Sequence, residues 1–159
     1  MSVEPKPVLN RRELHFRSLD AVVADAEALV ASPYTRTLGK WSLDRLLMHL
    51  ASAINGSIDG ISAKAPWFIR LLAPFLKKRF LTKTMSAGFQ LPKHIEADFF
   101  PAADSPRDAF EKLRAAVARL QNEKMTAKHP VLGKLTHEEW TQLHMRHAEL
   151  HLSFAVIDG

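Results

Sequence analysis

Apolar residues recur at α-helical spacing in four separate segments of this 159-residue chain, and this pattern limits the fold more than any other feature. The first segment begins at Ser18, a favourable N-cap, and ends at Ser32-Pro33. The second begins at Ser42 and runs to Gly60. The apolar positions are Leu19, Val22, Val23, Ala26, Leu29 and Val30 in the first, and Leu43, Leu46, Leu47, Leu50, Ile54 and Ile58 in the second. Both segments are predicted to form amphipathic helices.

The third and fourth segments carry stronger start signals. Ser105 can cap the third, with Pro106 at its first helical position and Asp108 in its first turn. The fourth begins with the capping box formed by Thr136 and Glu139. Their apolar faces contain Phe110, Leu113, Val117 and Leu120, and Trp140, Leu143, His147, Leu150, Phe154 and Ile157. No strand and no internal repeat is predicted, so we expect an all-α fold, a four-helix bundle in a single domain.

A long link, Ile61 to Asp104, connects the second and third helices. A link of this length is typical of a bundle with one crossover connection. It is expected to contain a short helix, Pro66 to Phe80, followed by an irregular stretch. Irregular segments of this length often form lids or pocket walls, so the Phe89–Phe100 loop is expected to border any site. Residues 1–14 are expected to form an extended N-terminal arm.

The chain contains no cysteine. This excludes disulfides, thiolate zinc sites and a cysteine nucleophile, and leaves histidine, aspartate and glutamate as metal ligands. The first 14 residues lack the apolar core of a signal peptide. The most apolar stretch, Ala65 to Leu76, is interrupted by Arg70 and Pro74 and is too short to span a bilayer. A cytoplasmic location is therefore expected.

The net charge of +5 is concentrated in one segment. Residues 60–93 carry seven basic side chains and no acidic one, so the rest of the chain sums to −2. This distribution argues against a nucleic-acid-binding protein. The favoured interpretation is a helix that packs over the bundle with a solvated basic face. Contact with an anionic small-molecule substrate or cofactor is the next interpretation, and contact with a membrane surface is not expected.

Within this segment, Lys77, Lys78 and Arg79 are the candidate cofactor-binding residues, as contacts for an anion. Their spacing spreads them around a helix, so all three cannot face one ligand. The segment also has more aromatic surface than a solvent-facing linker needs, from Trp67, Phe68, Phe75 and Phe80. A homodimer that uses these side chains is a further hypothesis.

Three of the eight histidines form a candidate metal site. His147 and His151 are four residues apart on the fourth helix, about 6 Å along its axis, which allows them to share one ion. His49, on the second helix between two apolar residues, is the best candidate for a third ligand, although it projects from the flank of the apolar face. The alternative is that these are interior histidines with ordinary hydrogen bonds, and the residues alone leave both interpretations open.

The remaining histidines fit this site less well. His144 lies about 10.5 Å along the axis from His151, too far to share an ion, and pairing it with His147 requires a stricter rotamer. His94, His129 and His137 are expected in loops or at a helix start, and His15 at the surface. Glu149 lies between the two ligand positions but points away from both, so we expect a structural or solvent-facing role and not that of a general base.

Several motifs of the chain resemble a known family. A helix-two histidine after Trp41-Ser-Leu, a long crossover and a closing His-x-x-x-His are similar to the DinB-like (YfiT-like) metal-binding four-helix proteins. The motifs Arg-Glu-Leu-His-Phe at 12–16, His-Pro-Val-Leu-Gly at 129–133 and Arg-His-Ala-Glu-Leu-His-Leu-Ser-Phe at 146–154 resemble a bacterial branch of unknown function within that superfamily.

The resemblance implies a divalent metal held by His49, His147 and His151. Nitrogen ligands suit zinc or nickel, and three neutral imidazoles leave the metal its full charge and an open position. Some relatives in the superfamily transfer low-molecular-weight thiols, others resemble hydrolases or isomerases, and many have no known activity. We therefore expect a metal-dependent transferase of a small thiol. A metal-hydroxide hydrolase and a stress-linked metal- or ligand-binding module without catalysis are the alternatives.

Overall fold

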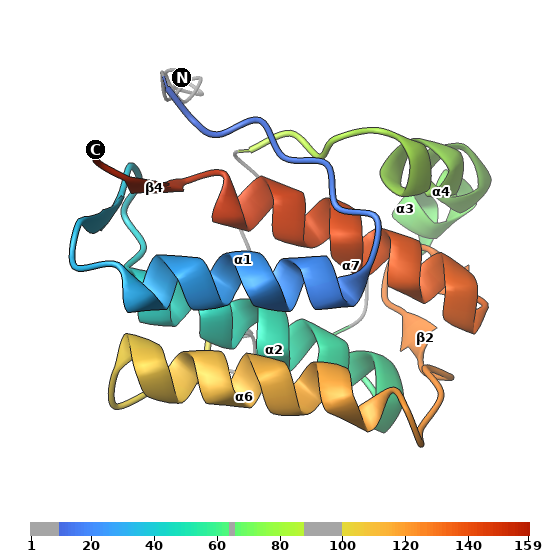
Figure 1. The fold of residues 1–159 in the computed structure, drawn as a ribbon. Coiled ribbons are helices and arrows are strands. Elements are labelled where there is room, and N and C mark those ends of the chain that lie inside the picture. Colours follow the sequence, from blue (N-terminus) through green and yellow to red (C-terminus); the bar gives the residue numbers. More distant parts are fainter. Residues whose placement is uncertain (1–9, 64–65, 88–99) are drawn as a thin grey trace.

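The computed structural model describes residues 10–63, 66–87 and 100–159. Its four long helices pack in the cyclic order α1, α6, α2, α7 (Figure 1), which confirms the predicted all-α bundle. In this arrangement α1 and α2 lie across the bundle from each other. The helices are α1 (Leu19–Ala31), α2 (Leu43–Asp59), α6 (Pro106–Arg119) and α7 (His137–Leu152).

Side-chain caps confirm three of the four predicted helix starts, and Ser42 precedes α2 without a side-chain cap bond. The Ser18 hydroxyl accepts a hydrogen bond from the Ala21 amide, and the Ser105 hydroxyl accepts one from the Asp108 amide. Thr136 and Glu139 form both bonds of the capping box. These contacts satisfy amide groups that a helix start would otherwise leave unpaired. The bundle core contains Val22, Ala26, Leu29, Leu46, Leu47, Leu50, Ile54, Phe110, Leu113 and Leu152.

The described part of the crossover contains two helices in place of the predicted single one. They are α3 (Trp67–Leu71) and α4 (Ala73–Thr82). Pro74 lies in the first turn of α4, and a proline cannot supply the amide that a continuous helix would need there, so the chain starts a new helix. α4 packs beside α7 (Figure 1). The Phe89–Phe100 loop lies outside the described residues except for Phe100, as do residues 1–9 of the N-terminal arm.

The prediction that the chain has no strand is wrong. α7 ends at Leu152, and the chain continues as β4 (Ala155–Ile157), which pairs antiparallel with β1 (Thr35–Thr37). A second antiparallel pair joins β2 (Lys128–His129) to β3 (Gly133–Lys134). Strands of two or three residues are too short to show alternation in sequence. Phe154 and Ile157 therefore leave the helical face to which their spacing assigned them.

The described part of the N-terminal arm is bound to the end of α7. The Arg12 amide donates to the Ser153 carbonyl at 3.0 Å, and the Arg12 guanidinium donates to the Leu152 carbonyl at 3.0 Å. The same guanidinium bonds both carboxylate oxygens of Asp25 on α1, each at 2.7 Å. The arm thus ties α1 to α7 at the end of the bundle where β1 and β4 pair. Within the described residues, no helix is long and apolar enough to cross a membrane.

Candidate metal centre

One face of α2 and the segment before it supply one side of the site. Arg45 and His49 are four residues apart, so they lie one above the other along α2, and Trp41 precedes the N-cap residue Ser42. His49 is buried, with 5% of its surface exposed. His147 and His151 follow on the C-terminal half of α7, which packs against α2. The packing of these two helices therefore brings together the three histidines that the sequence analysis selected.

The three imidazoles converge on a common point. The Nε2 atom of His147 lies 3.0 Å from the Nε2 atom of His49 and 2.9 Å from the Nε2 atom of His151. Ligand atoms of all three residues lie within 4.8 Å of one another. Tetrahedral ligands about 2.0–2.1 Å from a zinc ion would be about 3.3–3.4 Å apart. The two separations from His147 are within a few tenths of an ångström of these values, and the cluster therefore fits one metal ion after small side-chain shifts.

The protonation states of the three rings also favour a shared cation. The Nε2 atom of His147 carries either one hydrogen or one lone pair, yet it lies within hydrogen-bond distance of both other Nε2 atoms. It can therefore form only one of these two contacts as an ordinary two-centre hydrogen bond. A metal ion accepts a lone pair from each ring and removes this conflict. Within the described residues, no carboxylate and no other histidine joins the group.

Burial keeps the α7 histidines neutral, which is the state that binds metal. Loss of hydration, together with the smaller effect of nearby His49, lowers the pKa of His151 to about 3. The pKa of His147 is well below its ordinary value, because of burial first and then the neighbouring His151 and His49. The rings therefore offer lone pairs at neutral pH without having to release protons.

Two aromatic rings and one cation surround the cluster. The Trp41 ring stacks on His151 at 5.3 Å between centroids, and the Phe100 ring stacks on His49 at 4.4 Å. The Arg45 guanidinium lies 4.6 Å from the centre of Phe100 and 5.7 Å from the centre of Trp41. Phe100 agrees with the expectation that the Phe89–Phe100 loop borders the site, and it is the described residue of that loop. Arg45 is not among the predicted site residues, although its four-residue spacing from His49 could have revealed it.

Most of the other histidines have structural roles. The Ser57 hydroxyl donates to the Ile54 carbonyl at 2.6 Å, so the His144 Nε2 atom, 3.1 Å away, must donate to the Ser57 oxygen. His129 Nδ1 accepts bonds from the amides of Val131 and Leu132. His137 Nδ1 accepts a bond from the Met125 amide, and His15 is exposed as expected. His94 lies outside the described residues.

Glu149 has a structural role, as expected. It is 1% exposed, and its Oε1 atom accepts a 2.7 Å bond from the Phe16 amide and lies 3.0 Å from the Arg146 guanidinium. Arg146 also donates to the Phe16 carbonyl at 3.1 Å. This carboxylate therefore fixes the N-terminal arm to α7 and does not face the histidine cluster.

The candidate anion contacts lie on α4, which packs against α7. Lys77 forms a 2.7 Å ion pair with Glu139 in the first turn of α7, so it helps to hold the two helices together. Lys78 and Arg79 are exposed. No described contact links Lys78 or Arg79 to the histidine cluster. Their role as anion contacts stays a prediction.

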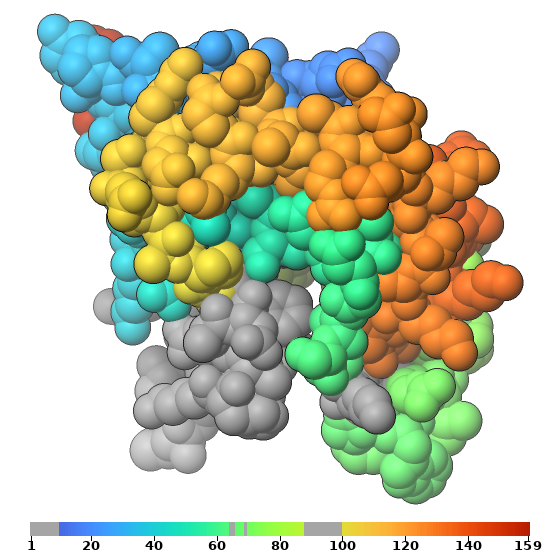
Figure 2. Space-filling model, turned by 90° about the horizontal axis from the view of Figure 1, so that it is seen from below, coloured from blue at the N-terminus to red at the C-terminus, as the bar shows by residue number. Residues whose placement is uncertain are grey.

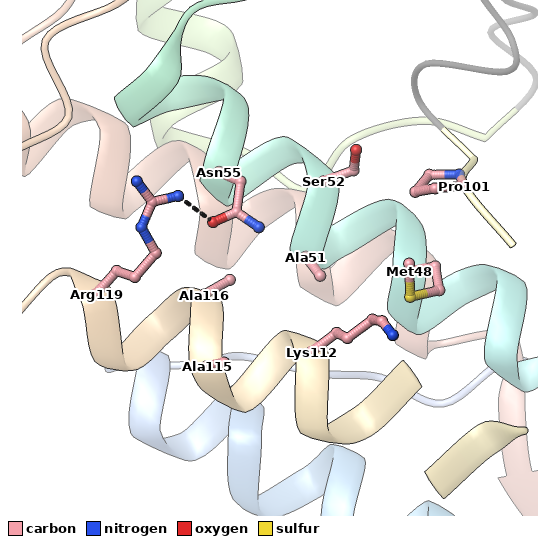
Figure 3. A pocket seen from close by; sticks show the side chains of 9 residues that line it. All are labelled: Met48, Ala51, Ser52, Asn55, Pro101, Lys112, Ala115, Ala116 and Arg119. Carbon is pink, nitrogen blue, oxygen red and sulfur yellow. Dashed lines mark hydrogen bonds between the residues drawn. The ribbon is translucent and has the colours of Figure 1, made fainter. Parts of the chain in front are cut away.

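A hollow of about 380 Å³ opens between α2 and α6 (Figure 3), separate from the cluster. On α2 its walls include Met48, Ser52 and Asn55, about a third of a turn around the helix from His49. On α6, Arg119 donates to the Asn55 side chain at 2.7 Å. Arg119 is also paired with Asp59 and Glu123, and Lys112 with Asp108. The cations of this hollow are thus neutralised, and it is not part of the candidate site.

The metal-free protein is expected to lose stability as the pH falls from about 6.5 to about 4. Burial lowers the pKa of His129 to about 4 and that of His144 to about 3, from 6.5 in an unfolded chain. Below pH 6.5 the unfolded chain therefore binds more protons than the folded one. Each histidine then removes up to about 1.4 kcal/mol of stability per pH unit. Urea unfolding in EDTA across this range would measure the slope, and His144→Gln should reduce it. A stability independent of pH would contradict the burial of these rings.

Comparison with known proteins gives a family and no function. The family model described as "Protein of unknown function (DUF1569)" matches residues 8–157, which include the three clustered histidines and the arm bound to α7. A search of curated proteins found no match, and a search of solved structures found none. Because the match covers nearly the whole chain, the protein belongs to the DUF1569 family of proteins of unknown function.

Proposed function

We propose that this protein is a DinB-like metal protein in which His49, His147 and His151 hold one zinc or nickel ion. The observation that carries the proposal is the convergence of three Nε2 atoms, with separations of 3.0 Å and 2.9 Å from His147 to the other two. The three histidines lie on α2 and α7, as the resemblance to the DinB-like proteins implies. A bacterial source and a cytoplasmic location remain predictions.

For the reaction, we propose activation of a small thiol toward an electrophile. When bound, the metal would supply a positive charge that lowers the pKa of a thiol in its open position. The sulfur would then bond to the electrophilic carbon as the bond from that carbon to its leaving group breaks; the leaving group would depart with the electron pair, and the thiol proton would pass to solvent. A hydrolase also needs a proton donor for its leaving group. Within the described residues, the cluster contains no carboxylate for that role, which supports thiol transfer over hydrolysis.

Arg45 is our candidate contact for an anionic group on the thiol. Its guanidinium lies over Phe100 and Trp41, the two rings that stack on His49 and His151. A guanidinium beside the cluster would attract a carboxylate or phosphate of the thiol cofactor. The apolar rings would shield this contact from water and so strengthen it. The proposal therefore places the anion contact on α2, in addition to the predicted residues of α4.

Cobalt substitution and a thiol-transfer assay test the reaction. Cobalt-loaded protein is expected to develop a new charge-transfer absorption band when bacterial low-molecular-weight thiols are added, and metal-replete protein should couple such a thiol to a chromogenic electrophile. No change with any thiol, but a spectral titration near pH 7 in buffer alone, would favour a metal-hydroxide hydrolase. No response to either would favour a binding module without catalysis.

A matched pair of variants tests the role of Arg45. Arg45→Met should raise the KM for an anionic thiol about tenfold while leaving the metal content unchanged. Arg107→Met is the control, because the Arg107 guanidinium also lies over a phenylalanine, Phe110, at 5.2 Å, but is an exposed side chain on α6 and not part of the cluster. Equal KM values in both variants would remove Arg45 from the proposal.

A further inference from the structure

The exposed apolar surface of the protein is concentrated on α3 and the start of α4. Seven large apolar side chains are exposed in the described part of the chain, and five of them fall between residues 67 and 75. Phe75 is 80% exposed, Trp67 is 73% exposed, and the others are Phe68, Leu71 and Leu72. We call these five side chains the apolar patch. Figure 2 shows this part of the chain, in green, at one corner of the molecule, away from α6.

The opposite side of α4 is already packed. Leu76, Phe80 and Leu81 contact the second core cluster, whose centre is Trp140 on α7. The ion pair between Lys77 and Glu139 adds a polar contact between the same helices. These contacts agree with the expected helix over the bundle. The packed side of α4 therefore leaves the apolar patch facing outward, and Phe80, which is partly buried, does not belong to the patch.

Unpaired positive charge accompanies the apolar patch. Arg70, Lys78, Arg79 and Lys83 are exposed, and none of them forms an ion pair within the described residues. No acidic residue occurs from position 60 to position 93. Exposed aromatic side chains next to unpaired cations are typical of elements that lie on an anionic lipid surface, with the rings at headgroup depth. A second copy of the chain would instead bring like charges together across the contact.

We propose that α3 and α4 dock this protein on an anionic membrane surface, with the apolar patch inserted among the lipids. Trp67 and Phe75 would supply apolar contact, and Arg70, Lys78, Arg79 and Lys83 would attract the lipid headgroups. This inference departs from the sequence-based expectation of no membrane contact because the sequence could not show which apolar side chains stay exposed. It does not depend on the metal or on the proposed reaction.

Sedimentation with lipid vesicles tests the proposal. The full-length protein should sediment with vesicles that contain phosphatidylserine, bind phosphatidylcholine vesicles much more weakly, and dissociate as salt is added. The Trp67→Ser/Phe75→Ser double variant should lose about tenfold or more in vesicle partitioning. Because both side chains are exposed, the variant should keep the wild-type circular dichroism spectrum. Tyr34→Ser, which replaces a 69% exposed ring elsewhere, is the matched control.

Charge-reversal variants and light scattering can contradict the docking proposal. Arg70→Glu/Arg79→Glu should abolish binding to anionic vesicles, whereas Lys128→Glu, at an exposed site on β2, should not. Equal binding of the wild type and both double variants would overturn the proposal. A wild-type dimer in light scattering that the Trp67→Ser/Phe75→Ser variant dissociates would also overturn it, because a second copy would then cover the apolar patch.

Discussion

Replacing Glu149 with alanine is expected to lower the free energy of unfolding by about 3–5 kcal/mol, because it breaks a buried ion pair and leaves its partners unsatisfied. The carboxylate is 1% exposed and contacts both the Phe16 amide and the Arg146 guanidinium. Without it, the arm loses a contact with α7, and Arg146 keeps a charge in a site where only 19% of its side chain is exposed. Urea unfolding at pH 7 measures the change.

Glu138→Ala is the control for this experiment, since Glu138 is exposed in the first turn of the same helix. It should change the free energy of unfolding by less than about 1 kcal/mol. The Glu149→Ala variant should bind as much metal per chain as the wild type at urea concentrations where it is still folded, because the carboxylate is not part of the histidine cluster. Loss of metal from the folded variant would show that Glu149 acts on the metal site and would contradict a purely structural role.

His147→Ala is expected to abolish stoichiometric metal binding. Its Nε2 atom lies within 3.0 Å of the Nε2 atoms of both His49 and His151, so its removal leaves two donors on separate helices. We expect the untagged wild type to contain about one zinc or nickel ion per chain, and the affinity of the variant to fall by at least about a hundredfold. Elemental analysis and a competitive chelator titration measure the two quantities.

His144→Ala is the matched control for His147→Ala. His144 is also a buried histidine of α7, but its Nε2 atom donates to Ser57 and is outside the cluster. The control should lower the unfolding temperature and keep the metal. If His144→Ala lost as much metal as His147→Ala, loss of packing and not loss of a ligand would explain both results.

The long helices could be predicted from sequence because their start signals are local. The Ser18, Ser105 and Thr136 caps act within three residues of their own positions, and each is formed as expected. The three clustered histidines were also identified, because His147 and His151 share one face of a helix and His49 has apolar neighbours. Local periodicity thus gave both the bundle and the positions of the candidate ligands.

Features that depend on distant contacts could not be predicted. β4 forms because Ala155–Ile157 meets Thr35–Thr37 across the bundle, and neither segment is long enough to show a strand pattern. The Phe89–Phe100 loop was expected to border the site, but sequence spacing does not contain the particular contact in which Phe100 stacks on His49. The exposure of Phe75 likewise depends on which side of α4 packs against α7.

X-ray absorption spectroscopy at the metal edge of the untagged, metal-replete protein tests the central claim most directly. The three-histidine site predicts three imidazole nitrogens at about 2.0–2.1 Å and a further light-atom ligand that exchanges with added anions. The spectrum should be absent from a variant in which His49, His147 and His151 are all alanine. One metal per chain with an unchanged spectrum in that triple variant would contradict the account.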